Sequence, residues 1–136
     1  MAAPFSWPVR VYWEDTDAGG IVFYANYLKF FERARTEWLR ALGIGQAQLR
    51  ERTGGMFVVT ETSVRYLRPA RLDDELRVTA ELSEAGRASM TLRQQALQHP
   101  GGELLAEGTI RIGWVDAATL RPARIPPPIL EALNTR

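Results

Sequence analysis

Two aspartates in a glycine-rich stretch are the residues of this sequence best suited to chemistry. Asp15 and Asp17 lie in the run Trp13-Glu-Asp-Thr-Asp-Ala-Gly-Gly20, shortly before a pattern typical of an apolar helix. The start of a helix exposes unpaired N–H groups that carry positive partial charge. A carboxylate beside it can act on an acyl group as a nucleophile or a general base, while the N–H groups stabilise the oxyanion. The alternative is that both aspartates only form a turn and cap the helix.

Other catalytic and metal-binding patterns are poorly represented in the sequence. It contains no cysteine, which excludes disulfides, thiolate nucleophiles and cysteine metal sites. The single histidine, His99, stands in a His-Pro-Gly-Gly turn, which argues against a Ser-His-Asp triad and against a zinc site. The stretch that begins at Asp15 resembles a calcium loop only faintly, because Asn26 stands where such a loop needs Glu. We therefore predict no metal and no cofactor.

Composition and charge narrow the class of protein. The chain has 136 residues, of which 46% are hydrophobic and 24% charged, as in ordinary globular domains. Its net charge of +1 gives no basic excess for nucleic-acid binding. No secretory signal pattern is present, and no apolar run approaches the ~18 residues of a membrane span. We expect one cytoplasmic domain over residues 1–136.

Residues 26–42 are predicted to form one long helix. Apolar residues recur at spacings of three and four, at Tyr27, Phe30, Phe31, Ala34, Trp38 and Leu42. Asn26 is a residue type that suits the N-cap, and Gly43 stands where a C′ glycine belongs. Because several of the apolar residues are large aromatics, we expect this helix to be central and deeply packed.

Period-two alternation predicts the strands. Val9, Val11 and Trp13 alternate with polar residues, which predicts a half-buried strand over 9–15. Strand-like segments follow at 57–66, 76–82, 88–98 and 104–115, with short helical pieces near 45–52 and 129–133. Strands joined by short turns pair antiparallel, and one sheet wrapped around one buried helix is the economical fold. We expect its free edge to be covered by dimerisation.

A family resemblance is carried by the run Tyr12-Trp-Glu-Asp-Thr-Asp-Ala-Gly-Gly-Ile-Val-Phe-Tyr-Ala-Asn-Tyr27, continued by Leu28–Glu37. It is similar to the YbgC-type acyl-CoA thioesterases, which are related to 4-hydroxybenzoyl-CoA thioesterase and linked to the Tol-Pal envelope system. The segments Val64–Asp74 and Gly86–Ser89 also match. The resemblance implies an α+β hotdog fold, in which an antiparallel sheet of about five strands wraps around one long central helix. It also implies a homodimer or homotetramer with its active site at the subunit interface.

The same resemblance implies roles for individual residues. The family's catalytic carboxylate falls on Asp17, and its carbonyl-polarising amide falls on the backbone N–H of Tyr24. Asp17 would attack an acyl-CoA thioester to form a mixed anhydride, or activate a water; the family leaves both routes open. YbgC-type sequences commonly have His where this chain has Tyr24. Catalysis in this chain would therefore depend on Asp17 and the amide. Asp15 is expected to be structural.

Substrate contacts follow from the resemblance as well. Arg87 is expected to face the phosphates of coenzyme A, with Phe23, Asn26 and Tyr27 also binding substrate. The alternative for Arg87 is a solvated residue of a hairpin turn. As a whole, the chain could instead be a noncatalytic acyl-thioester binder or a partner of an acyl carrier protein or of the envelope system. A hotdog dehydratase is the weaker third option, because His99 is far in sequence from the central helix.

Overall fold

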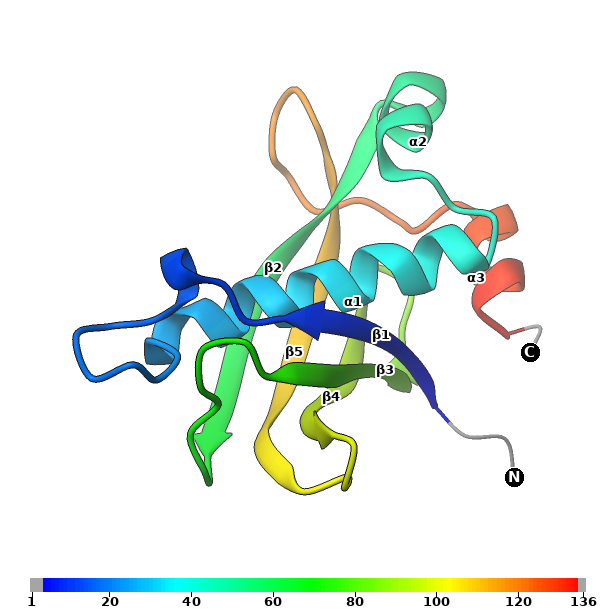
Figure 1. The fold of residues 1–136 in the computed structure, drawn as a ribbon. Helices are drawn as coiled ribbons and strands as arrows, with labels where there is room; N and C mark the ends of the chain where they lie inside the picture. The colour runs from blue at the N-terminus through cyan, green and yellow to red at the C-terminus, as the bar shows by residue number, and fades with distance from the viewer. Residues whose placement is uncertain (1–3, 135–136) are drawn as a thin grey trace.

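A five-stranded antiparallel sheet curves around one long helix in the computed structural model, which describes residues 4–134 (Figure 1). The strands are β1 (Phe5–Arg10), β2 (Gly55–Tyr66), β3 (Glu75–Ala85), β4 (Ser89–His99) and β5 (Leu104–Asp116). The helices are α1 (Tyr27–Ala41), α2 (Gln46–Thr53) and α3 (Pro127–Asn134), with 3-10 turns η1 (Trp13–Asp15) and η2 (Tyr24–Asn26). The sheet order is β1-β3-β4-β5-β2. The predicted α+β architecture is confirmed.

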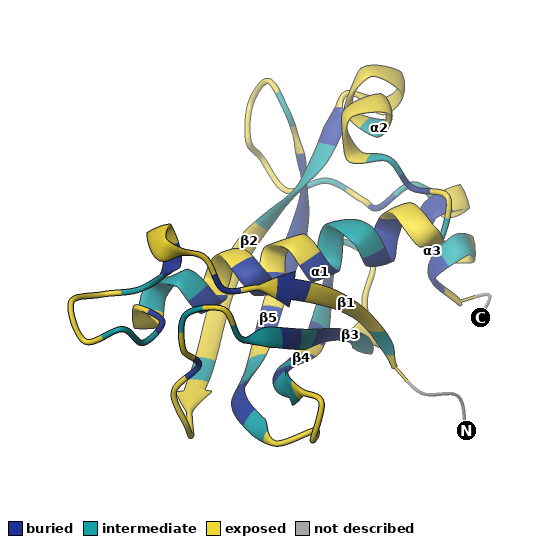
Figure 2. Ribbon diagram, viewed as in Figure 1, coloured by how far each residue is buried: buried dark blue, intermediate teal, exposed yellow. Residues whose placement is uncertain are grey.

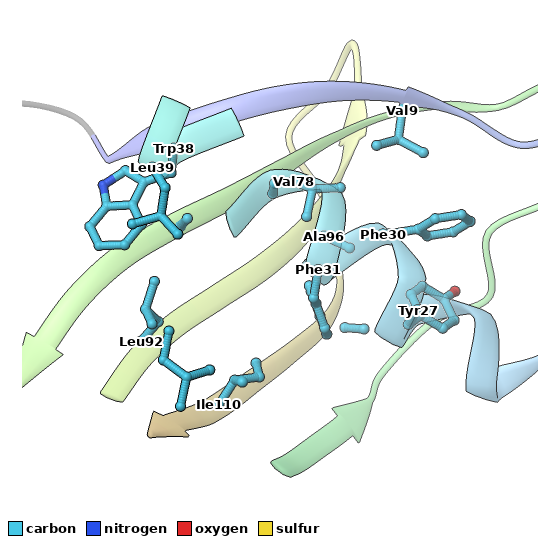
Figure 3. Packing of buried hydrophobic residues seen from close by; sticks show 14 of the residues in the cluster. Val9, Tyr27, Phe30, Phe31, Trp38, Leu39, Val78, Leu92, Ala96 and Ile110 are labelled. Carbon is cyan, nitrogen blue, oxygen red and sulfur yellow. The ribbon is translucent and has the colours of Figure 1, made fainter. Parts of the chain in front are cut away.

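The predicted central helix is α1, and its buried side is the predicted one. Tyr27 and Phe30 lie toward its start, and Trp38 and Leu39 lie toward its end (Figure 3). Gly43 follows the helix with a φ of 86°, a left-handed conformation that glycine adopts without strain. Its N–H donates to the Arg40 carbonyl, and the next N–H, of Ile44, donates to Leu39, which completes a Schellman end.

Asn26 does not cap α1 with its side chain, contrary to the prediction. Its backbone is already helical, because the turn η2 precedes α1 and starts the helical path at Tyr24. The Asn26 N–H donates to the Phe23 carbonyl at 2.8 Å, and its side-chain Nδ2 donates to the Asp15 carbonyl at 2.9 Å. Asn26 therefore ties the preceding loop to the helix.

The first strand is shifted toward the N-terminus, and Trp13 is not buried. The prediction of a strand over 9–15 is wrong beyond Arg10, where β1 ends. Val9 and Val11 are buried as expected, but Trp13 is 77% exposed. The reason is the turn η1, in which the Asp15 N–H donates to the Tyr12 carbonyl at 3.0 Å. A 3-10 turn has three residues per turn, so the alternation of a strand cannot continue through it.

The polar core contact that holds α1 on the sheet comes from β4. Gln94 is fully buried, and its Nε2 donates to the carbonyls of Phe31 and Thr79 at 2.9 and 3.0 Å. Its Oε1 accepts a hydrogen bond from Arg35 at 3.0 Å, and burial lowers the pKa of that guanidinium. Satisfied buried polar groups fix relative positions, so this network sets the helix against β3 and β4.

The sheet has two edges of different character. β1 is six residues long and contains Pro8, which blunts an edge. β2 is twelve residues long, pairs within residues 4–134 only with β5, and exposes the run Val59–Ser63 (Figure 2). The expectation of edge pairing therefore falls on β2 and stays a prediction.

Candidate active site

The segment that carries Asp17 is a tight hairpin. The Asp17 N–H donates to the Ile21 carbonyl at 2.9 Å, and the Gly20 N–H donates to the Asp17 carbonyl at 3.0 Å. Gly20 has a φ of 77°, the conformation that closes a three-residue hairpin loop and favours glycine. Gly20 therefore allows the turn that places the Asp17 carboxylate at the tip of the hairpin.

The hairpin is held against the connection between β2 and β3. The Val22 N–H donates to the Ala70 carbonyl at 2.9 Å, and Ile21 pairs with Arg71 in an antiparallel bridge. The Ala70 N–H in turn donates to the Tyr27 hydroxyl at 3.2 Å. The hairpin, the start of α1 and this connection therefore form one hydrogen-bonded unit.

Asp15 is a buried structural residue, in agreement with its expected role. It is 2% exposed, and its Oδ2 accepts the Tyr12 N–H at 2.8 Å. Its carbonyl accepts the Phe23 N–H and the Asn26 Nδ2, each at 2.9 Å. These bonds join the two ends of the Asp17 hairpin.

The Asp15→Ala variant is expected to unfold more easily, by about 1–3 kcal/mol, because the Tyr12 N–H loses its acceptor. Urea denaturation followed by circular dichroism measures the difference. Asp17→Asn serves as the control, since its side chain is exposed and asparagine keeps an Oδ1 for the Gly19 N–H, so the unfolding free energy should stay nearly unchanged. Equal loss in both variants would contradict the structural assignment of Asp15.

Asp17 is exposed, and only one of its two carboxylate oxygens accepts a hydrogen bond from residues 4–134. Oδ1 accepts the Gly19 N–H at 2.9 Å, which fixes the orientation of the side chain. Oδ2 makes no hydrogen bond to any of residues 4–134. The carboxylate therefore offers one oxygen to a substrate or a water.

The Tyr24 N–H lies at the first residue of η2, at the start of the helical path into α1. Among residues 4–134 it has no hydrogen-bond acceptor, whereas the preceding N–H, of Phe23, donates to Asp15. An unpaired N–H at a helix start can donate to a substrate oxygen, and the aligned peptide dipoles favour negative charge there. The resemblance implies this N–H as the oxyanion donor, and that role stays a prediction.

An open pocket of about 240 Å³ with aromatic walls lies beside Tyr24. Its lining residues are Ile21, Val22, Tyr24, Tyr27, Tyr66, Leu67, Arg68 and Pro69. The Tyr66 ring centroid lies 5.5 Å from that of Tyr27 and 6.0 Å from that of Tyr24. Burial raises the pKa of both the Tyr27 and the Tyr66 hydroxyl, and Tyr66 is the less deeply buried of the two. Sequence reasoning did not single out Tyr66; its signals were an aromatic residue at the end of a strand and its place in the matched segment Val64–Asp74.

The structure brings most predicted site residues together. Phe23 is 44% exposed, and its ring centroid lies 4.8 Å from that of Tyr24. Tyr27 is 3% exposed and forms the inner wall of the pocket. Asn26 lies between them, with its amide nitrogen bonded to the Asp15 carbonyl. These residues and Asp17 share one end of α1.

Arg87 lies at the opposite end of the molecule. It is exposed in the turn between β3 and β4, where its carbonyl accepts the Ile125 N–H at 2.8 Å. The Asp17 hairpin is anchored beside Arg71, just before β3 begins, whereas Arg87 follows the end of β3. At about 3.3 Å per residue, the eleven residues of β3 separate the two by roughly 30 Å.

Metal-binding side chains do not gather in the described part of the chain. Within residues 4–134, no group of three or more His, Asp or Glu side chains is placed to hold an ion. His99 ends β4, with Nε2 3.9 Å from a Glu75 carboxylate oxygen. None of the described helices is both long enough and apolar enough to span a membrane.

Comparison with known proteins places this arrangement in a family. The sequence profile of the thioesterase-like superfamily matches residues 11–133. The acyl-CoA thioesterase YbgC of Haemophilus influenzae is 42% identical over 130 residues, which are 96% of this chain and 94% of that protein. The chain belongs to the thioesterase-like superfamily. The predicted family and the predicted enzyme class, a thioester hydrolase, are thereby confirmed.

Solved structures resemble this thioesterase over nearly its whole length. A probable thioesterase from Bartonella henselae is 32% identical, with a TM-score of 0.84 over 91% of this chain and 100% of that one. A 1,4-dihydroxy-2-naphthoyl-CoA thioesterase from Synechocystis has a TM-score of 0.89 over 98% of this chain and 97% of that one, at 20% identity. The second likeness is one of fold alone, and it agrees with the predicted hotdog fold.

Proposed function

We propose that this thioesterase hydrolyses an acyl-CoA to a free acid and coenzyme A, with Asp17 as the catalytic carboxylate and residues 1–136 acting as one domain. One observation carries the assignment. The exposed Asp17 carboxylate, with one oxygen free of hydrogen bonds to residues 4–134, and the unpaired N–H of Tyr24 belong to the same hydrogen-bonded unit. Acyl transfer needs these two functions, a nucleophile or base and an oxyanion donor.

The reaction uses these groups in two ways that lead to the same products. The Tyr24 N–H donates to the thioester carbonyl oxygen and stabilises the negative charge that develops there. In the nucleophilic route, Asp17 Oδ2 bonds to the carbonyl carbon, the C–S bond breaks, and coenzyme A leaves as a thiolate. Water then hydrolyses the mixed anhydride and regenerates the carboxylate. In the general-base route, Asp17 takes a proton from the water that attacks the same carbon, the C–S bond breaks, and the proton passes to the departing thiolate of coenzyme A.

The neighbouring side chains hold the acyl end of the substrate. Phe23 and Tyr27 supply apolar surface beside the Tyr24 N–H. Asn26 orients this surface, because its amide nitrogen fixes the start of the helix to the Asp17 hairpin. In this proposal the thioester carbon lies between the hairpin and the first turn of α1.

A second copy of the chain completes the site. The Tyr66 end of β2 lies at the start of α1, and the Gly55 end lies toward the Arg87 turn, because Gly113 pairs with both Val58 and Ser89. If two β2 edges pair antiparallel about a two-fold axis, the start of α1 in one copy meets the end of α1 in the other. The partner's turn then brings its Arg87 toward Asp17.

The Arg87→Ala variant is expected to raise KM about tenfold or more with little change in kcat, because a charge-assisted bond to a phosphate is lost. The KM of this variant should also depend less on salt concentration than the KM of the wild type does. Steady-state kinetics of thiol release at two ionic strengths measure both effects. An unchanged KM would remove Arg87 from the proposed site.

Hybrid dimers test whether Arg87 acts across the interface. Chains carrying Asp17→Asn are unfolded and refolded together with chains carrying Arg87→Ala. If the two residues of one site come from different chains, each hybrid dimer has one intact site, and a component with the wild-type KM returns. If both come from the same chain, every site with an intact Asp17 lacks Arg87, and KM stays raised.

The broader proposals rest on the family resemblance. They are a homodimer that can pair into a homotetramer, an acyl carrier protein as a second carrier of the thioester, a cytoplasmic location and a link to the Tol-Pal system. Light scattering of the purified protein tests the oligomer, and a pull-down with acylated carrier protein tests the carrier.

Thiol release from a panel of short, aromatic and long acyl-CoAs tests the reaction itself. Hydrolysis of any member supports the enzyme. Saturable binding of acyl-CoA without hydrolysis by the folded protein would instead favour a noncatalytic acyl-thioester binder, for which Tyr24 in place of the usual His is the motivating observation.

A further inference from the structure

One carbonyl oxygen, that of Asp15, holds both ends of the turn that precedes α1. It accepts the Phe23 N–H at 2.9 Å and the Asn26 Nδ2, also at 2.9 Å. Phe23 is the residue before η2, and Asn26 is the last residue of η2. Asp15 is 2% exposed, so this oxygen belongs to a fixed, buried residue. The turn is therefore attached to the same buried atom at its beginning and at its end.

The two bonds leave the Asp15 carbonyl without a site for the Tyr24 N–H. A carbonyl oxygen has two lone pairs, and the Phe23 N–H and the Asn26 amide use both. The Tyr24 N–H follows the Phe23 N–H directly in the chain and has no acceptor among residues 4–134. Unpaired N–H groups bond to an acceptor wherever one is within reach. The Asn26 amide therefore keeps the nearest internal acceptor occupied, and the Tyr24 N–H stays available to a substrate oxygen.

The turn η2 would hold this arrangement only weakly by itself. It is a 3-10 turn of three residues, and hydrogen bonds in such turns have poorer geometry than those of an α-helix. Asn26 has helical backbone angles, φ −72° and ψ −18°, and its side chain does not cap α1. That side chain instead reaches a residue eleven positions earlier in the chain. Without it, only the Phe23 N–H would connect the turn to the Asp15 carbonyl.

We propose that Asn26 is a positioning residue for thioester hydrolysis, which keeps the Tyr24 N–H free and directed at the thioester carbonyl by occupying the Asp15 carbonyl. The inference rests on the proposed function, in which the Tyr24 N–H is the oxyanion donor. It differs from the direct substrate contact that the resemblance implies for Asn26. A residue that acts only through the donor affects the transition state, so its loss should lower kcat and leave KM nearly unchanged.

Substitutions of Asn26 test this role by steady-state thiol release, with thermal unfolding of each variant as the check of folding. Asn26→Ala should lower kcat by about tenfold or more, because a small misplacement of a catalytic group is costly. Asn26→Asp keeps the size of the side chain and should lose as much at neutral pH, since an ionised carboxylate cannot donate to a carbonyl. Thr16→Val is the matched control. It removes another bond from a side chain to a backbone carbonyl in the same loop, that of the Thr16 hydroxyl to Trp13 at 2.9 Å, and should retain the wild-type kcat.

A double-mutant cycle separates positioning of the donor from a general loosening of the loop. In Tyr24→Pro chains, which have no N–H at residue 24, Asn26→Ala should cost little further kcat, because the group through which Asn26 acts is already gone. In Asp17→Asn chains the same substitution should cost its full factor, because the donor is still present. The same factor in the wild-type, Tyr24→Pro and Asp17→Asn backgrounds would overturn the proposal and leave Asn26 a purely structural residue.

The state of the Tyr24 N–H can also be followed without any activity. The chain contains four tyrosines, so protein labelled with nitrogen-15 tyrosine gives four amide signals in a two-dimensional NMR spectrum, and Tyr24→Phe identifies the signal of residue 24. In the wild type this N–H should exchange rapidly with solvent. In Asn26→Ala it should exchange about tenfold more slowly or less still, because it can turn to the vacated lone pair of the Asp15 carbonyl.

The outcomes distinguish this inference from the proposed function. A folded Asn26→Ala variant with the wild-type kcat overturns the positioning role, and so does a variant in which only KM rises, which would show a direct contact with the substrate. If Asn26→Ala does not fold, Asn26→Asp and Asn26→Ser take its place. An unchanged exchange rate of the Tyr24 N–H overturns the role of Asn26 while hydrolysis by the wild type still supports the enzyme. Absence of hydrolysis by the wild type overturns the proposed function.

Discussion

The Asp17→Asn variant is expected to lose thioesterase activity by about a hundredfold or more while folding normally. Asparagine has nearly the same size and keeps an Oδ1 that can accept the Gly19 N–H, so the hairpin should retain its shape. What disappears is the negative charge and with it the nucleophilic or basic oxygen. The effect should fall on kcat, because the carboxylate acts on the reacting carbon or on the attacking water.

Thiol release under saturating substrate measures this loss, and thermal unfolding of each variant shows whether the fold is kept. Asp73→Asn is the matched control: Asp73 is also an exposed aspartate, and at its φ of 70° asparagine is well tolerated. It should retain the wild-type kcat. Equal rates for Asp17→Asn and the wild type would rule out both routes through this carboxylate.

The Tyr24→Pro variant is expected to lower kcat by about 10²–10³-fold, the usual cost of removing one oxyanion donor. Proline has no N–H, and the first position of a helix is where it is best tolerated. The residue before a proline must be extended, and Phe23 already is, with φ −64° and ψ 131°. The substitution therefore removes the donor at small conformational cost.

Tyr24→Ala separates the backbone from the side chain, since it loses the ring and keeps the N–H. We expect it to retain most of kcat and to change mainly KM, because the ring contributes to the rim of the pocket. Both variants are compared by steady-state thiol release and by circular dichroism. If the Ala and Pro variants lose the same amount of kcat, the backbone N–H is not the donor.

Local sequence was sufficient where one element decides its own structure. The spacing of Tyr27, Phe30 and Trp38 predicts both the length and the buried side of α1, because a helix that packs on a sheet must be apolar on one side. Gly43 predicts the end of α1, because the left-handed backbone conformation that ends a helix favours glycine. The later strands were predicted within a few residues, since turn residues bracket each of them.

Local sequence was insufficient where a distant segment competes. Trp13 follows the alternation of a strand, but its neighbours form a 3-10 turn and the chain leaves the sheet after pairing Val11 with Asp74. Asn26 suits an N-cap, yet its side chain binds the carbonyl of Asp15, eleven residues away. For Asn26 a hydrogen bond outside the local window overrode a local preference, and at Trp13 a 3-10 turn, closed by the Asp15 N–H on the Tyr12 carbonyl, overrode the alternation of a strand.

The sequence by itself determined the fold class and the central helix, and it singles out Asp17 as the candidate carboxylate, because periodicity, turn glycines and a long motif are local properties of the chain. Only the tertiary structure decided that Asp15 is buried, that the Tyr24 N–H is left unpaired, that Tyr66 joins the pocket and that Arg87 lies at the far end of β3. These features depend on which strands become neighbours and which hydrogen bonds are already made, and both arise only when distant segments pack together.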